Sequence, residues 1–152
     1  MTPYYNSKGI TIYHGDCRDI LPTLPQVDLI LTDPPYGMSY HSGHYVGVNP
    51  HRPIIGDDAY PCWAVGQCRS IARSVTMFFL RWDNLAELPK PDSLLVWVKN
   101  NWTAGDLNHD YARTWEAIAA WNGPEHAFDN GRPSDVLYAD RVPPTSLLHP
   151  TE

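Results

Sequence analysis

Four consecutive residues, Asp33-Pro34-Pro35-Tyr36, combine groups that could bind a planar molecule carrying an amine. The Asp33 carboxylate accepts hydrogen bonds. The two prolines have fixed φ angles and no N–H, so the turn is stiff and offers carbonyl oxygens without competing donors. Tyr36 adds a flat ring on which a second ring can stack. Acceptors beside a stacking face suit a planar ring with an exocyclic amine, such as a nucleobase flipped out of DNA.

The stretch before these residues, 27–32, is apolar, β-prone and short. This pattern predicts a buried strand that ends at Asp33. A strand buried on both faces is typical of a parallel α/β sheet. Because ligands of such sheets bind beyond the carboxyl ends of the strands, we expect residues 33–36 at the functional edge.

The rest of the chain alternates predicted strands with predicted helices, as a parallel sheet requires. Further short apolar or alternating runs predict strands at residues 10–13, 75–80, 94–98 and 135–138. Residues 114–121 fit a helix by their alanine content and a strand by their alternation.

Helices are predicted from caps and prolines. Asp16 can cap a short helix, and Asp57 and Asp58 open a longer one that runs to about residue 74. A third, short helix is predicted over residues 83–88. The longer helix should turn four residues inward, namely Val65, Cys68, Ile71 and Ala72.

The Asp33-to-Tyr36 tetrapeptide resembles the Asp/Asn/Ser-Pro-Pro-aromatic motif of the DNA methyltransferases that methylate exocyclic amines with S-adenosylmethionine (SAM). The resemblance extends to the permuted group of this family, in which the catalytic half precedes the cofactor-loop half. It covers nearly the whole chain, through segments 15–16, 20–21, 27–37, 96–99, 115–116 and 149–152.

The resemblance implies a Rossmann-like α/β methyltransferase sheet, mostly parallel, and it favours a strand at 114–121. It also implies one catalytic region over residues 1–152, with variable loops near 38–58 and 100–134. No G-x-G sequence occurs among the ten glycines, and residues 149–152 resemble the segment that precedes the Gly-rich SAM turn. We therefore expect an incomplete sheet that holds the catalytic half only, with the C-terminal cofactor-loop portion missing.

The activity implied is site-specific transfer of a methyl group from SAM to an exocyclic amine in double-stranded DNA with a flipped base. Aspartate at the first motif position favours adenine N6 over cytosine N4. Asp33 and the Pro34 carbonyl would hold the two amine hydrogens, Pro35 completes the motif, and Tyr36 would stack on the base. Asp33 needs no raised pKa for this role. Methylation of protein or RNA is a less favoured alternative.

The resemblance implies that Asp16, Asp33 and Thr151 contact the cofactor. For Asp16, helix capping explains the residue equally well, and the two roles are compatible. An incomplete sheet exposes a strand edge, so we expect the chain alone to be marginally stable or to self-associate, and to bind SAM weakly at best. A second polypeptide could supply the Gly-rich half. The alternative function is a truncated, non-catalytic remnant, or one half of a split methyltransferase that acts as a DNA-binding or partner subunit.

The formal net charge of −6 is the wrong sign for DNA binding through overall charge, because phosphate contacts require Lys and Arg. Local cations are the candidates for DNA contact, although an ordinary surface role explains each of them as well. The candidates are Arg52, Lys99, Arg113, Arg132 and, more weakly, His109 and Arg141.

The composition is that of a globular protein, with 43% apolar and 12% aromatic residues and no apolar run long enough to span a membrane. Without a signal-peptide pattern, a cytoplasmic location is expected. The three cysteines have no metal spacing, which indicates free thiols. His41, His44 and His51 also lack a matching acidic or cysteine partner, so we expect a solvated loop rather than a metal site.

Overall fold

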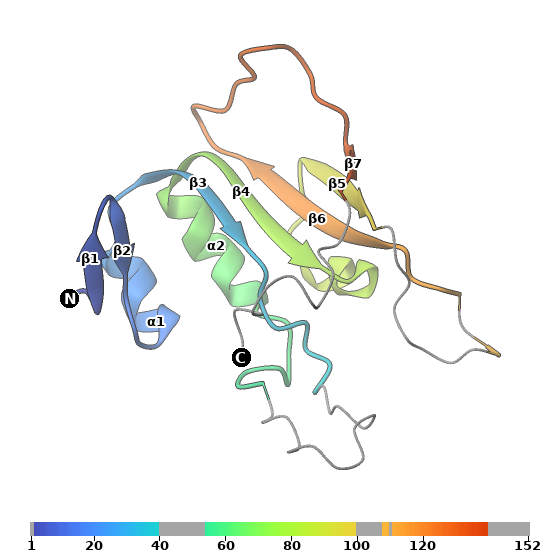
Figure 1. The fold of residues 1–152 in the computed structure, drawn as a ribbon, viewed down its shortest axis with the longest axis horizontal. Coiled ribbons are helices and arrows are strands. Elements are labelled where there is room, and N and C mark those ends of the chain that lie inside the picture. Colours follow the sequence, from blue (N-terminus) through green and yellow to red (C-terminus); the bar gives the residue numbers. More distant parts are fainter. Residues whose placement is uncertain (1, 40–53, 100–107, 110, 140–152) are drawn as a thin grey trace.

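The computed structural model describes residues 2–39, 54–99, 108–109 and 111–139. Within these ranges the chain forms seven strands, two α-helices and two 3₁₀ helices (Figure 1). In chain order they are β1 (Tyr5–Ser7), β2 (Ile10–Ile12), α1 (Cys17–Ile20), η1 (Leu21–Thr23), β3 (Val27–Thr32), α2 (Cys62–Ile71), β4 (Ala72–Leu80), η2 (Trp82–Glu87), β5 (Ser93–Val98), β6 (Trp115–Asn122) and β7 (Val136–Tyr138).

Five of the described strands form one sheet in the order β3-β4-β6-β5-β7. β3 runs parallel to β4, and β5 runs parallel to β7. β6 is antiparallel to both β4 and β5, so β3, β4, β5 and β7 all point the same way. The sheet is therefore mixed rather than mostly parallel: two of its four pairings are parallel and two are antiparallel. It confirms the α/β class predicted from the sequence.

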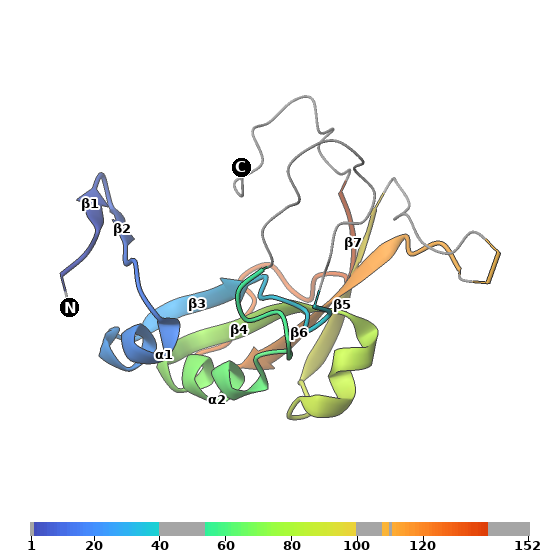
Figure 2. The ribbon, with the colours of Figure 1, turned by 90° about the horizontal axis from the view of Figure 1, so that it is seen from below.

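β4 is the strand around which the core is built. Its residues alternate between the two faces, and Phe78 and Leu80 point toward α2, where Val65 is fully buried. Trp121 of β6 packs its ring edge-on against Phe78, with ring centroids 6.0 Å apart. Figure 2 shows α1 and α2 on the same side of the sheet, and this side contains the main apolar cluster.

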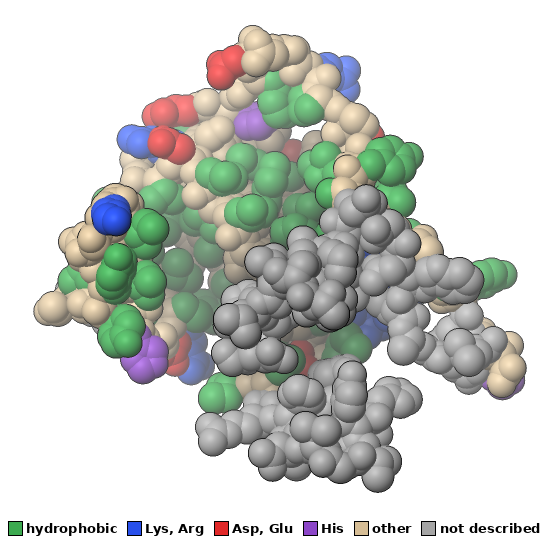
Figure 3. Space-filling view, in the orientation of Figure 1, with side chains coloured by type: hydrophobic (Ala, Val, Ile, Leu, Met, Phe, Trp, Pro, Cys, Tyr) green, Lys and Arg blue, Asp and Glu red, His purple; other side chains and the backbone are tan. Residues whose placement is uncertain are grey.

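The other face of the sheet is largely apolar as well, but within the described residues no helix covers it. Leu29 and Leu31 of β3 are 50% and 58% exposed, and their register with Val75 and Met77 places all four on this face. Figure 3 shows hydrophobic side chains gathered there. The prediction that β3 is buried on both faces is therefore wrong, because in the described part of the chain helices cover only one face of the sheet.

The strand expected at residues 10–13 forms outside this sheet. β2 pairs with β1 in a separate hairpin whose turn residues, Lys8 and Gly9, both have positive φ angles. Two such residues give the tight turn that matches the twist of paired strands. Within the described residues β2 therefore does not belong to the sheet that contains β3.

Other element boundaries moved for local reasons. The long helix begins at Cys62 rather than at Asp57, and it gives way to β4 at Ala72. Of the four residues expected to face inward, Val65, Cys68 and Ala72 are buried, whereas Ile71 is only partly buried. Residues 115–122 are a strand, as the resemblance favoured.

Two expectations from composition have structural counterparts. Cys17, Cys62 and Cys68 are free thiols, as their spacing indicated. No helix in the described ranges has the length and apolar character needed to cross a membrane. The three loop histidines, at positions 41, 44 and 51, lie outside the described residues.

The exposed leucines of β3 generate a first prediction. Apolar side chains on a strand with an open edge promote association, so the chain should self-associate as its concentration rises into the micromolar range. Replacing both exposed residues, Leu29→Ser with Leu31→Ser, should shift the chain toward monomer without loss of its secondary structure. Sedimentation velocity measures the first effect and circular dichroism the second.

Leu80→Ala is the matched control for that experiment, because Leu80 is fully buried on the helix-covered face. It should cost about 2–5 kcal/mol of unfolding free energy and leave the tendency to associate in place. A wild-type chain that stays monomeric throughout this range would contradict the account of the exposed face.

Candidate active site

The sheet brings several chemically active side chains to one edge. β3, β4 and β5 end there, and they are followed by Asp33, Arg81 and Lys99, respectively. The antiparallel β6 begins at the same edge, which adds Glu116. Sequence reasoning named Glu116 only as part of a family landmark. A carboxylate inside an otherwise apolar strand was the signal that could have marked it as a site residue.

Asp33 directly follows β3, and the residue has an exposed surface. Neighbouring groups nevertheless crowd its carboxylate, and this partial desolvation raises the pKa of Asp33 above its ordinary value. The Tyr36 hydroxyl donates a hydrogen bond that opposes the shift, while the more distant Glu116 carboxylate adds to it and the Lys99 ammonium opposes it. Asp33 is thus an acceptor that water solvates poorly.

Tyr36 lies against this carboxylate and is partly buried. Desolvation, together with the hydrogen bond to Asp33, raises the pKa of Tyr36 well above its usual range, so the phenol stays neutral. The two side chains that the motif predicted to act together therefore lie close enough to shift each other's pKa. Pro34 and Pro35 between them are partly buried.

Lys99 and Glu116 form a buried ion pair beside the motif. The Lys99 side chain is 5% exposed, its ammonium donates to the Glu116 carboxylate, and it also lies 5.8 Å from the centre of the Trp97 ring. An ammonium held in this way is not free to reach a DNA phosphate, so we withdraw Lys99 as a DNA contact. A buried pair of this kind depends on both partners, because losing either one strands the other charge.

A cavity of about 330 Å³ lies beside the motif. Tyr36 is among its lining residues, and so are Arg81 and Asp83, which form an ion pair with a separation of 2.6 Å. The full lining is Tyr36, Gly37, Met38, Arg81, Asp83, Asn84 and Glu87. A lining that combines a tyrosine with polar and charged residues suits a polar ligand.

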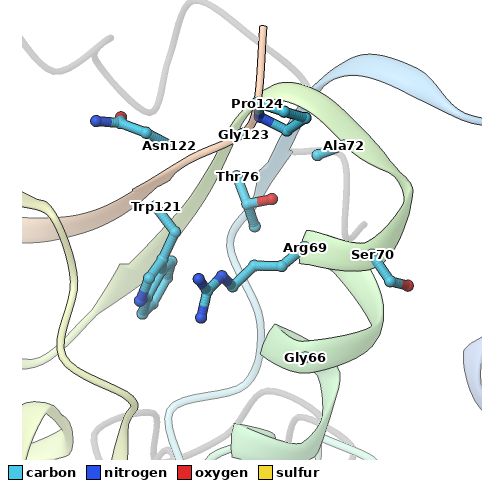
Figure 4. A pocket seen from close by; sticks show the side chains of 9 residues that line it. All are labelled: Gly66, Arg69, Ser70, Ala72, Thr76, Trp121, Asn122, Gly123 and Pro124. Atoms are coloured by element: carbon cyan, nitrogen blue, oxygen red, sulfur yellow. The ribbon is translucent and has the colours of Figure 1, made fainter. Parts of the chain in front are cut away.

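A second cavity, of about 360 Å³, lies far from this edge, between the end of α2 and the end of β6 (Figure 4). The buried Thr76 hydroxyl has no hydrogen-bond partner among the described residues. Figure 4 shows the Arg69 side chain extending along this cavity from α2. The cavity opens near the amino end of β4, opposite to the edge that holds Asp33.

Asp16 is the N-cap of α1, as its sequence position predicted. Its carboxylate accepts a hydrogen bond of 2.9 Å from the Arg18 backbone N–H and forms an ion pair with the Arg18 guanidinium at 2.5 Å. These bonds lower the pKa of Asp16 to about 2. The capping role is thereby confirmed, and the cofactor-contact role stays a prediction.

The remaining residues predicted to contact DNA or the cofactor fall into two groups, those in the described part of the chain and those outside it. Arg113 shortly precedes β6, which begins at the edge that holds Asp33, whereas Arg132 lies in the connection from β6 to β7, which starts where β6 ends. Both are exposed, and the sheet does not bring them together. Arg52, Arg141 and Thr151 lie outside the described residues.

Comparison with known proteins points to one group of enzymes, although no protein-family model matches the chain. Over 107 residues the chain is 28% identical to the type II methyltransferase M.ScaI of Streptomyces caespitosus; this region is 64% of the chain and 32% of M.ScaI. The chain therefore spans about a third of the length of this curated relative.

Solved structures give the fold. The crystal structure of the M1.HpyAVI–SAM complex matches 90% of this chain and 67% of its own, with a TM-score of 0.60 and 16% identity. A crystal structure of M1.HpyAVI alone matches 84% of this chain and 66% of its own chain, with a TM-score of 0.56 and 14% identity. The chain has the methyltransferase fold of M1.HpyAVI. It corresponds to about two thirds of that protein.

The raised pKa of Asp33 generates a second prediction. A carboxyl group whose pKa is higher in the folded state stabilises the fold when protonated, and that contribution is lost as the pH rises above about 3.9, the unfolded value. Asp33→Asn removes this effect, so its melting temperature should exceed that of the wild type by about 1–3 °C at neutral pH. The difference should shrink toward zero below the unfolded pKa.

Differential scanning calorimetry at several pH values measures the difference. Asp58→Asn is the matched control, since Asp58 is exposed and lies outside the strand edge. It should show no such pH-dependent gain. An Asp33→Asn variant that is less stable than the wild type at neutral pH would show that the carboxylate is not desolvated.

Proposed function

We propose that this chain is the base-holding part of a DNA methyltransferase that transfers a methyl group from SAM to an exocyclic amine. The observation that carries the proposal is the placement of Asp33 and Tyr36 where β3 ends, with Tyr36 lining a cavity at this edge. The similarity to M.ScaI and the fold of M1.HpyAVI support it. Asp at the first motif position favours adenine N6 as the target, with cytosine N4 as the alternative.

The chemistry asked of these residues is to make a poor nucleophile reactive. The lone pair of an exocyclic amine is delocalised into the ring of the base. Two acceptors, the Asp33 carboxylate and the Pro34 carbonyl, would hold both amine hydrogens and draw the nitrogen toward tetrahedral geometry, which frees the lone pair for attack. Tyr36 would stack on the flipped base and fix its plane.

The desolvated environment of Asp33 supports this role. A carboxylate with few water contacts forms stronger hydrogen bonds to a ligand than a fully solvated one, because fewer competing donors surround it. The raised pKa is thus a by-product of the setting, and Asp33 remains ionised at neutral pH in this proposal. The Tyr36 hydroxyl, which lowers the pKa of Asp33, would have to leave one acceptor position of that carboxylate free when the amine binds.

SAM supplies the methyl group on its sulfonium when it is bound. The described residues fit its binding only in part. Asp33 stands at the edge where the methyl group is needed, but Asp16 is engaged by Arg18, and the sequence has no G-x-G turn. We infer that a Gly-rich turn beside β3 is supplied by a further part of the polypeptide or by a second polypeptide.

The second candidate function is that of a remnant or partner subunit without activity of its own. The open edge of β3 and its exposed leucines favour this reading for the chain in isolation. Calorimetric titration with SAM separates the two. The chain alone should bind SAM weakly at best, and micromolar binding would show that its own residues complete the site.

The central mutational prediction concerns Asp33. In an active methyltransferase that contains this chain, Asp33→Ala should lower the rate of methyl transfer at least about a hundredfold, the range seen when one oriented polar group is removed from an active site. DNA binding should be largely retained, because phosphate contacts carry most of the affinity. Transfer of radiolabelled methyl groups and a mobility-shift assay measure the two effects.

Asp58→Asn again serves as the control, because Asp58 is an exposed acidic residue outside the motif. This variant should transfer methyl groups at the wild-type rate. Retained turnover in Asp33→Ala would remove this carboxylate from the mechanism. Loss of turnover together with loss of DNA binding would assign it to the DNA interface instead.

A further inference from the structure

Asp57 has an unexpected position in this fold. The sequence pattern assigned it to the start of the long helix, but α2 begins five residues later, at Cys62, with Pro61 as its N-cap. Asp57 is 5% exposed and packs against the segment that follows the Asp33-to-Tyr36 motif. A carboxylate buried to this extent needs hydrogen-bond donors, so its bonds indicate what it does.

Those donors are consecutive backbone amides. The Gly37 N–H donates to Asp57 Oδ1 at 2.9 Å and the Met38 N–H donates to the same oxygen at 3.2 Å. The Ser39 N–H donates to the backbone carbonyl of Asp57 at 2.6 Å. One residue, twenty positions downstream, therefore holds the three amides that come immediately after Tyr36.

The local backbone is shaped to make these bonds. Gly37 has a φ of +72°, a left-handed conformation that favours glycine. A Cβ atom at Gly37 would lie 2.5 Å from the Tyr60 backbone nitrogen, so a larger residue would push the segment away. Gly37 can thus approach the 57–60 segment closely because it has no side chain. This close approach brings its N–H within reach of Asp57.

The Tyr36 carbonyl is hydrogen-bonded to a different element, η2. The Asn84 side-chain amide, in η2, donates to the Tyr36 carbonyl at 3.4 Å, and the Asn84 side-chain oxygen accepts from the Arg81 N–H at 3.2 Å. The bond to Tyr36 is long and therefore weak. The Asp57 bonds are shorter and involve a charged acceptor, so they contribute most to the position of the Tyr36 backbone.

We propose that Asp57 is a positioning residue for the base-binding motif: its buried carboxylate holds the Gly37 and Met38 amides and so fixes the Tyr36 ring against Asp33. The inference rests on the proposed function, in which Tyr36 stacks on the target base. A stacking ring acts only when its plane is set, and a shift of about 1 Å at a reacting centre can lower a rate about a hundredfold.

The first test uses the chain itself and needs no activity. Tyrosines are replaced by 3-fluorotyrosine, and the Tyr36 resonance in the ¹⁹F spectrum is assigned by its loss in Tyr36→Phe. In the wild type this resonance should be shifted from that of free fluorotyrosine. In Asp57→Ala it should move toward the free value, because the segment is released.

Asp57→Asn is the conservative variant, since it keeps one oxygen that can accept from both amides. It should retain the wild-type Tyr36 resonance, and so should the control Asp58→Asn. A folded Asp57→Ala with an unmoved Tyr36 resonance would overturn the proposal and leave Asp57 a purely structural role. Movement in Asp57→Asn as large as that in Asp57→Ala would contradict the assignment to this acceptor oxygen.

Hydrogen exchange keeps the test decisive if Asp57→Ala does not fold. In the wild-type chain the Gly37 and Met38 amides should exchange slowly compared with other amides outside helices and strands. Exchange at the unprotected rate would overturn the proposal without any variant.

The second test uses an active methyltransferase that contains this chain. Asp57→Ala should lower kcat for methyl transfer about tenfold to a hundredfold with little change in the KM for SAM, and Asp57→Asn should restore most of it. If the Tyr36 resonance moves as expected while Asp33→Ala remains active, the positioning role stands and the proposed function fails. If Asp33→Ala is inactive while Asp57→Ala turns over normally, the proposed function stands and the positioning role of Asp57 fails.

Discussion

The parallel pairing of β3 with β4 is the constraint on which the rest of the structure depends. It aligns Leu31 with Met77 and Thr32 with Phe78, so that β3 ends at the same edge as β4. Pro34 and Pro35 then prevent β3 from continuing, because proline has no N–H for the ladder and its φ is fixed. The chain must turn there, and the turn leaves Asp33 and Tyr36 at the edge where parallel sheets bind ligands.

The cost of this arrangement is visible in the charges around the edge. Asp33 is partly desolvated, and nearby Lys99, which is almost fully buried, is paired with the partly buried Glu116. The Lys99 ammonium is engaged by the Glu116 carboxylate, to which it donates a hydrogen bond. The ion pair therefore lets a cation sit near the motif without blocking the carboxylate.

The local sequence was sufficient to predict those strands and helix ends that depend on short apolar runs, on prolines or on a capping residue. The bounds of the strand at 27–32 and most of the strand at 94–98 follow from such runs, and Asp16 caps its helix as expected. The strand at 115–122 was ambiguous, because alanine favours a helix and only its pairing between β4 and β5 decides for a strand. Pairing partners are a property of the whole sheet and cannot be read from eight residues.

The errors have the same origin. Leu29 and Leu31 belong to an apolar run that looks buried, yet their exposure depends on what covers the face of the sheet on which they lie. Asp57 looks like a helix cap in its own neighbourhood, and nothing near it in the sequence indicates that its donors lie twenty residues earlier. Long-range partners of this kind become visible only when the two segments are seen side by side.

The most direct test of the account is a crystal structure of an active methyltransferase that contains this chain, bound to S-adenosylhomocysteine and to a DNA duplex with its target base. The account predicts a flipped base whose exocyclic nitrogen lies about 2.7–3.2 Å from both an Asp33 carboxylate oxygen and the Pro34 carbonyl oxygen, with its ring on Tyr36. A base amine held by other groups, with Asp33 turned away or paired with Lys99, would contradict it.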